Sequence, residues 1–117
     1  MIFDSHAHYD DEAFNEDREA ILNSLPENGI SPIVNVSAQL SGVTATVELT
    51  EKYPFIYGSV GVHPDHVGEL SEEKIQWMKE LAGREKIVAV GEIGLDHYWD
   101  TESDELQRKW FIRQLEL

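Results

Sequence analysis

Two histidines stand one residue apart near the start of the chain, in the stretch Ile2-Phe3-Asp4-Ser5-His6-Ala7-His8. The apolar beginning of this stretch favours a β-strand, on which alternate side chains point to the same face. His6 and His8 would then present two neutral imidazoles to one side, an arrangement that can hold a divalent metal ion. A His-x-His pair also occurs without a ligand, so this pair alone leaves metal binding open.

Other polar residues follow later apolar runs. His63 and Glu92 come directly after the runs 55–62 and 87–91, and Asp96 lies in the loop that Glu92 begins. In parallel α/β folds, functional sites gather at the carboxyl ends of the strands, so these side chains are expected to lie near the two histidines. Two imidazole nitrogens and one carboxylate oxygen suit zinc, manganese or a similar divalent ion, and a carboxylate can bridge two metals.

Each candidate also has a structural explanation. His63 could close a turn, Asp96 could cap a loop, and an arginine or backbone amides could hold the Glu92 carboxylate in place of a metal. The acidic run 10–12 is expected to be a solvated face. The weaker site candidates are His66, His97, Tyr98 and Trp99.

The elements that must position these residues form four alternating strand–helix units. Strands are predicted at 2–8, 33–36, 55–62 and 87–91, and helices at 15–25, from 41 to before 53, from an N-cap at 71 to 83, and from about 101 onward. Nearly continuous apolar strands imply a parallel sheet covered by helices. No glycine-rich phosphate motif follows the first strand, which argues against a dinucleotide-binding fold. The last helix is expected to run through Leu106, Trp110, Phe111 and Leu115.

The composition limits the possible partners. With 23 acidic and 9 basic residues the formal net charge is −14, and such a surface repels a nucleic-acid backbone. A protein that coats duplex DNA is therefore disfavoured, whereas a metal-lined pocket that takes one phosphodiester is not, because bound cations reverse the local potential. The chain has no cysteine, and we see neither a signal peptide nor a membrane span, so we expect a cytoplasmic protein with no membrane partner.

Three motifs occur in a distinctive order and spacing: Phe3-Asp4-Ser5-His6-Ala7-His8, Val60-Gly61-Val62-His63-Pro64 and Gly91-Glu92-Ile93-Gly94-Leu95-Asp96. Together they resemble the TatD-type metal-dependent deoxyribonucleases, which are amidohydrolase-like TIM barrels. The resemblance implies a (β/α)8 barrel that uses one or two divalent ions, either zinc, manganese or magnesium. It also implies hydrolysis of phosphodiester bonds in DNA, single-stranded or at an end, through a metal-activated water.

The resemblance also implies a role for each site residue. His6 and His8 would hold one metal, and Glu92 would bridge to a second. Glu92 and Asp96 would act in catalysis, with Asp96 supporting the metal site or its loop, and His63 would lie near the substrate phosphate.

Two positions depart from the family pattern. The family often has a second histidine soon after the His-Pro pair, where this chain has Asp65 before His66. His97 stands where an aromatic residue is more usual. Both departures could alter substrate contacts, and neither touches the expected ligands.

The length departs further, because an eight-unit barrel needs about 250 residues and this chain has 117. We therefore expect residues 1–117 to form the N-terminal half of such a barrel, a truncated parallel (β/α)4 portion with open first and fourth strands. The later ligands of the family, two histidines and an aspartate, would lie outside it. The isolated chain is expected to need its missing half or to self-associate.

Two alternative functions stay open. Relatives with the same first-strand histidines act on amides, esters or rings that undergo deamination, so a related hydrolase with another substrate is one alternative. An inactive truncated fragment or a noncatalytic metal-binding or interaction module is the other, and the absent ligands favour it for the chain as given.

Overall fold

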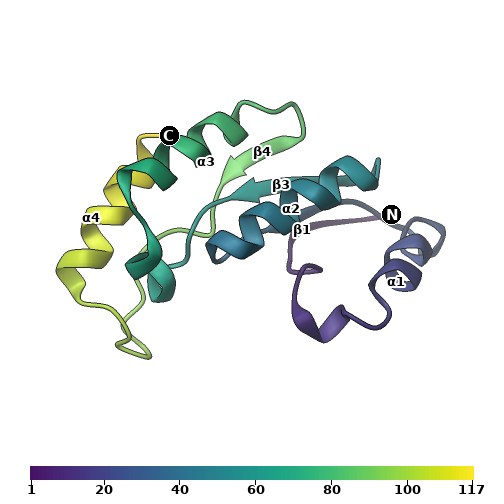
Figure 1. The fold of residues 1–117 in the computed structure, drawn as a ribbon. Helices are drawn as coiled ribbons and strands as arrows, with labels where there is room; N and C mark the ends of the chain where they lie inside the picture. Colours follow the sequence, from purple (N-terminus) through teal and green to yellow (C-terminus); the bar gives the residue numbers. More distant parts are fainter.

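The fold is one four-stranded parallel sheet in the order β1-β2-β3-β4, seen in a computed structural model that describes residues 1–117. The strands are β1 (Ile2–Ala7), β2 (Ile30–Val36), β3 (Ile56–Val60) and β4 (Ile87–Val90). The helices that alternate with them are α1 (Arg18–Ser24), α2 (Leu40–Lys52), α3 (Glu72–Ala82) and α4 (Asp104–Leu115) (Figure 1). The expected α/β class with four strand–helix units is therefore confirmed.

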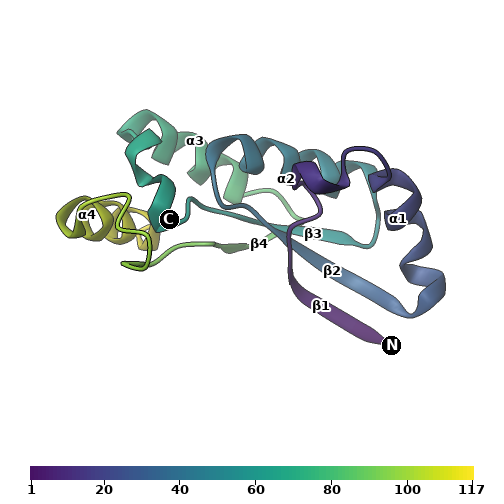
Figure 2. The ribbon, with the colours of Figure 1, turned by 90° about the horizontal axis from the view of Figure 1, so that it is seen from below.

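The helices leave one side of the sheet uncovered. Figure 2 shows α2 and α3 on the same side of the strands, and α1 joins this layer because its buried Leu22 packs in one cluster with Leu49 of α2. Helix α4 lies beyond the end toward which β3 and β4 point (Figure 1). None of the four helices combines the length and apolar character that a membrane crossing requires.

Two apolar clusters form the core between the sheet and its helix layer. The larger one joins α2, α3 and α4 to β3 and β4, and it includes Val43, Val60, Met78, Ile87 and Trp110. The smaller one joins α1 and α2 to the first three strands, and it includes Ala7, Leu22, Ile33, Leu49 and Ile56. Both clusters reach the carboxyl ends of the strands, since Ala7 lies between His6 and His8 and Val62 directly precedes His63. The core thus holds the site residues without including them.

Helix α3 follows the sequence closely. Ser71 is its N-cap and accepts a hydrogen bond from the Lys74 amide through Oγ at 3.2 Å, and Gly83 is its C-cap. Ile75, Met78 and Leu81, which recur every three residues, are all buried. A capping side chain and an apolar repeat of three to four residues are local signals, so the sequence specifies this helix well.

Helix α1 is shorter than the predicted range 15–25, and Asn15 does not cap it. A 3₁₀ turn, Glu12–Phe14, precedes it, and the helix begins at Arg18 rather than at Asn15. The reason is Arg18, whose Nη2 donates to the Asn15 Oδ1 at 2.9 Å and whose Nε donates to the Tyr9 carbonyl at 2.6 Å. The side chain that would cap a longer helix is thus occupied by a contact that closes the preceding loop.

Helix α4 differs more from its prediction. It begins at Asp104 with Ser103 as N-cap, three residues after the predicted start. Leu115 is 61% exposed, whereas Gln107 and Gln114 are almost fully buried with Trp110 between them. The buried face of this helix does not follow hydrophobicity, because two of its buried side chains are polar.

Candidate metal centre

Lateral hydrogen bonds hold the carboxyl ends of three strands together. Ser37, directly after β2, donates from Oγ to the Gly61 carbonyl at 2.8 Å and accepts from the Gly61 amide at 2.9 Å. Its own carbonyl accepts from the Glu92 amide at 2.8 Å. One serine thus fixes the ends of β2, β3 and β4 against one another, and the backbone of Glu92 is part of this framework.

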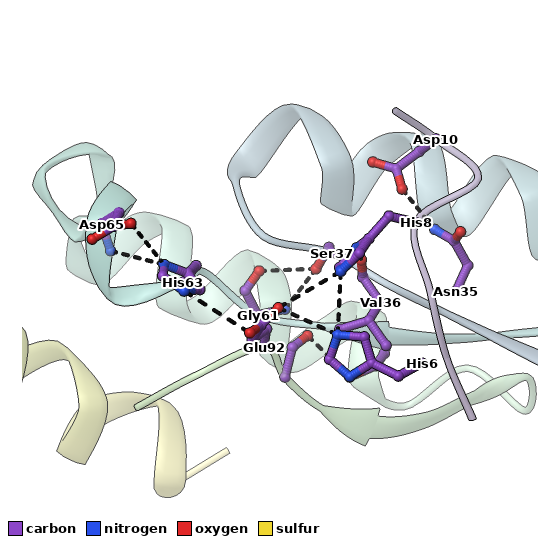
Figure 3. A network of polar contacts seen from close by, with 12 residues as sticks. His6, His8, Asp10, Asn35, Val36, Ser37, Gly61, His63, Asp65 and Glu92 are labelled. Carbon is purple, nitrogen blue, oxygen red and sulfur yellow. Dashed lines mark hydrogen bonds and ion pairs between the residues drawn. The ribbon is translucent and has the colours of Figure 1, made fainter. Parts of the chain in front are cut away.

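Three side chains converge at this edge of the sheet (Figure 3). His6 lies on β1, His8 follows it, and their Nε2 atoms are 3.2 Å apart. The Glu92 Oε2 lies 3.4 Å from the Nε2 of His6 and 3.8 Å from that of His8. The two imidazoles share a face, as predicted, and they point toward the carboxylate that follows β4.

The donor set fits a divalent cation. The Nδ1 of His8 lies 2.8 Å from the Val36 carbonyl, so a neutral His8 carries its proton there and presents the Nε2 lone pair to the site. Ligands about 2.0–2.1 Å from a tetrahedral zinc ion lie about 3.3 Å from each other, close to the two shorter separations found here. No lysine or arginine lies within ion-pair distance of Glu92, so the alternative of a carboxylate held by arginine is wrong.

His63 approaches the same carboxylate from the other side. Its Nε2 is 3.9 Å from the Glu92 Oε1 and 3.6 Å from the Asp96 Oδ2. The two oxygens of Glu92 therefore face different groups, with Oε2 toward the paired histidines and Oε1 toward His63. The structure brings together all five residues that the sequence selected: His6, His8, His63, Glu92 and Asp96.

Sequence reasoning did not select Asp65, which shapes this second side of the site. The Asp65 amide donates to the Nδ1 of His63 at 3.0 Å, and its carboxylate lies 3.6 Å from the same nitrogen. A neutral His63 therefore accepts at Nδ1 and carries its proton on Nε2. The three side chains of His63, Asp65 and Asp96 form a second compact group of possible ligand atoms. The sequence did hold a signal for this contact: Asp65 follows His63 by two positions, and the side chain of an N-cap residue commonly accepts a hydrogen bond from the amide two residues later.

The weaker candidates lie outside the cluster. His66 is exposed, and His97 pairs with Asp104 of α4 at 3.0 Å. Tyr98 and Trp99 are exposed and pack on each other, with ring centroids 4.7 Å apart. These four side chains take no part in the converging set.

The acidic run after His8 is only partly a solvated face. Asp11 and Glu12 are exposed, but Asp10 accepts a hydrogen bond from the buried Asn35 side chain at 3.0 Å. The Asn35 Oδ1 also accepts from the Tyr9 amide at 2.7 Å, which ties the loop after His8 to β2. Burial raises the pKa of the Tyr9 hydroxyl, and the charge of Asp4 raises it further, so this phenol stays protonated at neutral pH.

Parallel strand–helix units with a His-x-His pair after the first strand and a glutamate after the fourth have the layout of metal-dependent hydrolases. The family assignment agrees: the model of the family described as TatD related DNase matches residues 3–117. The chain belongs to the TatD-related DNase family, so the resemblance seen in the three motifs is confirmed.

Known relatives align with nearly the whole of this chain, but the alignment covers less than half of each relative's own sequence. An uncharacterised metal-dependent hydrolase, YabD of Bacillus subtilis, is 37% identical over 100% of this chain and 46% of its own length. A protein described as a 3'-5' ssDNA/RNA exonuclease, TatD of Erwinia tasmaniensis, is 28% identical over 99% of this chain and 45% of its own length. The chain thus spans about half the length of the curated relatives that it matches.

Solved structures support the same fold. YjjV, a TatD homologue from Escherichia coli, superposes with a TM-score of 0.86 at 30% identity, over 98% of this chain and 45% of that one. An uncharacterised amidohydrolase from Saccharomyces cerevisiae superposes with a TM-score of 0.84 at 19% identity, which supports the fold alone. The four units therefore correspond to less than half of a TatD barrel, in agreement with the predicted fold class.

Proposed function

We propose that the whole protein is a metal-dependent hydrolase that cleaves phosphodiester bonds in DNA, acting on single strands or on DNA ends. The observation that carries this proposal is the convergence of His6, His8 and Glu92 at one edge of the sheet, with His63 on the opposite side of the carboxylate. The exonuclease activity on ssDNA and RNA ascribed to the Erwinia TatD supports this substrate class. Residues 1–117 would then be the N-terminal half of the barrel.

In this proposal His6 and His8 would hold one cation through Nε2, and Glu92 would bridge to a second. The separate directions of its Oε1 and Oε2 support a bridging role. Zinc, manganese and magnesium are the candidate ions, and a bound divalent ion supplies an activated water and withdraws charge from the phosphate. Three ligands cannot saturate two ions, so further ligands would come from outside these residues.

His63 is proposed to bind the substrate phosphate. Because its Nδ1 accepts the Asp65 amide, the proton on Nε2 is available to a phosphate oxygen placed between Glu92 and Asp96. Asp96, whose Oδ2 lies 3.6 Å from this nitrogen, would support the metal site or the loop around it. An anionic substrate would need the cations to approach, because the groove beside His8 is lined by Asp10, Asp11 and Glu12.

The test combines metal binding with cleavage. Calorimetry with zinc alone on this chain should show binding that weakens by more than about tenfold in His6→Ala and Glu92→Gln. In the whole protein, the same two variants should lose metal-dependent release of nucleotides from single-stranded DNA. Glu105→Gln is the matched control, because Glu105 is an exposed carboxylate on α4 outside the site, and it should behave as wild type in both assays.

Three outcomes contradict the proposal in different ways. Cleavage that survives His6→Ala would reject the metal mechanism. Zinc binding that depends on His6, without cleavage of DNA by the whole protein, would favour the related hydrolase with another substrate. Absence of both binding and cleavage would leave the noncatalytic fragment or interaction module.

A further inference from the structure

Two glutamines on α4 are buried, although glutamine is usually exposed in folded proteins. Gln107 is 0% exposed and Gln114 is 1% exposed. They are seven positions apart, which places them two turns apart on one face of the helix, with their Cα atoms about 10.5 Å apart along the axis. Neither glutamine is hydrogen-bonded to a side chain of the site. Each one instead contacts the backbone of a segment that carries a site residue.

Gln114 holds the segment that leads into His63. Its Oε1 accepts a hydrogen bond from the Val62 amide at 2.7 Å, and its Nε2 donates to the Val62 carbonyl at 3.2 Å. Both backbone groups of one residue are thus paired with one side chain, as they would be with a neighbouring strand. Val62 is buried and immediately precedes His63, so this contact fixes where the histidine leaves β3.

Gln107 holds the loop of Asp96 in the same way. Its Oε1 accepts from the Asp96 amide at 2.9 Å, and its Nε2 donates to the Asp96 carbonyl at 2.9 Å and to the Glu102 carbonyl at 3.1 Å. The loop after β4 has no strand or helix of its own between Gly91 and Ser103. A buried amide therefore supplies hydrogen bonds that regular structure supplies elsewhere.

The two held segments meet at the site. The His63 Nε2 and the Asp96 Oδ2 are 3.6 Å apart, one on each segment, and α4 also packs against the 3₁₀ segment Pro64–Glu69 that follows His63 (Figure 1). The spacing of Gln107 and Gln114 along a rigid helix thus sets the distance between these two segments. Moving either one would change the direction of the His63 Nε2–H.

We propose that Gln107 and Gln114 are positioning residues. Through them, α4 fixes the position of His63 relative to Asp96. The proposal rests on the proposed function for the role of His63, but it concerns only the geometry of this pair. The expected consequence of losing either amide is a His63 ring that no longer keeps a fixed direction and a single tautomer. The paired histidines His6 and His8, on the far side of Glu92, should be unaffected.

The test uses Gln107→Met and Gln114→Met, which keep the length of the side chain and remove its polar atoms. Nitrogen-15 spectra of the histidine rings at one fixed pH report which ring nitrogen carries the proton. In the wild-type chain, His63 should show an unprotonated Nδ1 and a protonated Nε2. In each variant its two signals should shift toward a mixture of tautomers, while those of His6 and His8 stay in place.

The matched control is Trp110→Leu, which removes buried volume from the same helix between the two glutamines and leaves both of their amide groups in place. It should lower stability without moving the His63 signals. A purely structural role for the glutamines predicts equal shifts in all three variants, or none in any, and either result overturns the proposal.

A second variant guards against loss of folding. Gln114→Glu is compared at acidic pH, where its carboxyl group is protonated and keeps both an oxygen for the Val62 amide and an O–H donor for the Val62 carbonyl without burying a charge. Hydrogen exchange at the Val62 amide should accelerate by about tenfold or more in Gln114→Met and much less in Gln114→Glu. Equal exchange in the two variants would contradict the proposed contact. Neither readout requires DNA cleavage, so the positioning role and the nuclease function can fail separately.

Discussion

At the scale of single residues, the site depends on how closely the ends of β3 and β4 approach. A Cβ built on Gly61 would lie 2.7 Å from the carbonyl carbon of Gly91 and 2.8 Å from its oxygen. Those are backbone atoms, which cannot rotate aside as a flexible side chain can. Glycine at position 61 therefore permits the contact that carries Glu92 to the histidines, and this is a packing requirement of the motif that contains His63.

Gly61→Ala should displace the Gly91–Glu92 segment. We expect the free energy of unfolding to fall by about 1–3 kcal/mol, and zinc affinity to fall by about tenfold or more because the carboxylate moves away from His6 and His8. Denaturant titration and calorimetry measure the two effects. Gly83→Ala is the control, since its nearest contact would be the Glu80 carbonyl at 3.4 Å and it should change stability by less than about 0.5 kcal/mol. Unchanged zinc binding in Gly61→Ala would contradict the argument.

The residues that could be predicted from the sequence are those whose position alone defines their environment. A parallel sheet brings together the residues at the carboxyl ends of its strands, whatever else surrounds them. Four site residues stand at such ends: His6, His8, His63 and Glu92. Gln107 and Gln114 could not be found in this way. Their burial depends on the backbone groups of distant segments, which no local pattern records.

At the scale of elements, one ion pair joins α3 to α4. The Nε of Arg113 donates to the Glu72 Oε1 at 3.0 Å, and its Nη2 donates to the Oε2 at 2.7 Å. This hydrogen bonding lowers the pKa of the Glu72 carboxyl, with a smaller contribution from the charge of Lys109. The same contact raises the pKa of Arg113. Because the pair connects the helix that holds the site loops to the rest of the layer, its pH dependence bears on the site.

The sign of that dependence follows from the lowered pKa. Since the Glu72 pKa is lower in the folded chain than its unperturbed value of 4.5, the pair contributes stability above that value and loses it as the pH falls through the folded pKa. Arg113→Gln should therefore lower stability near neutral pH and approach the wild-type value as the pH falls through the lowered pKa of Glu72. Urea titrations at several pH values measure this. Lys79→Gln removes one exposed charge from α3, and it should show no such convergence; a parallel pH profile for both variants would contradict the assignment.

Elements were predictable where their ends are set locally. Ser71 and Gly83 define α3 from the sequence alone. Helix α1 begins late because the Asn15 side chain accepts a hydrogen bond from Arg18 instead of capping the helix. Strand β3 ends at Val60 rather than at Val62 because Gln114 of α4, not a neighbouring strand, is hydrogen-bonded to Val62. In both cases a contact between separate segments overrides a local preference.

At the scale of the whole molecule, the sheet is an open one. Strands β1 and β4 are its edges, and apolar side chains on both are exposed: Ile2 is 63% exposed, Phe3 59% and Val88 54%. Open edges with apolar neighbours favour pairing with another chain. The net charge of −14 opposes such pairing through mutual repulsion. The balance between these two effects should therefore depend on salt.

We expect this chain to self-associate, and to do so more strongly as salt is added. At about 1 M salt the screening length falls to about 3 Å, so repulsion between acidic surfaces is removed while apolar contact is retained. Light scattering coupled to gel filtration should show a molar mass that rises with salt. Phe3→Glu and Val88→Glu should reduce the association, because each places a charge beside an open edge.

Tyr98→Glu is the control, since Tyr98 is 80% exposed in a loop outside the sheet, and it should associate as wild type does. A monomer of unchanged mass at every salt concentration, with cooperative thermal unfolding, would show that the open edges need no partner.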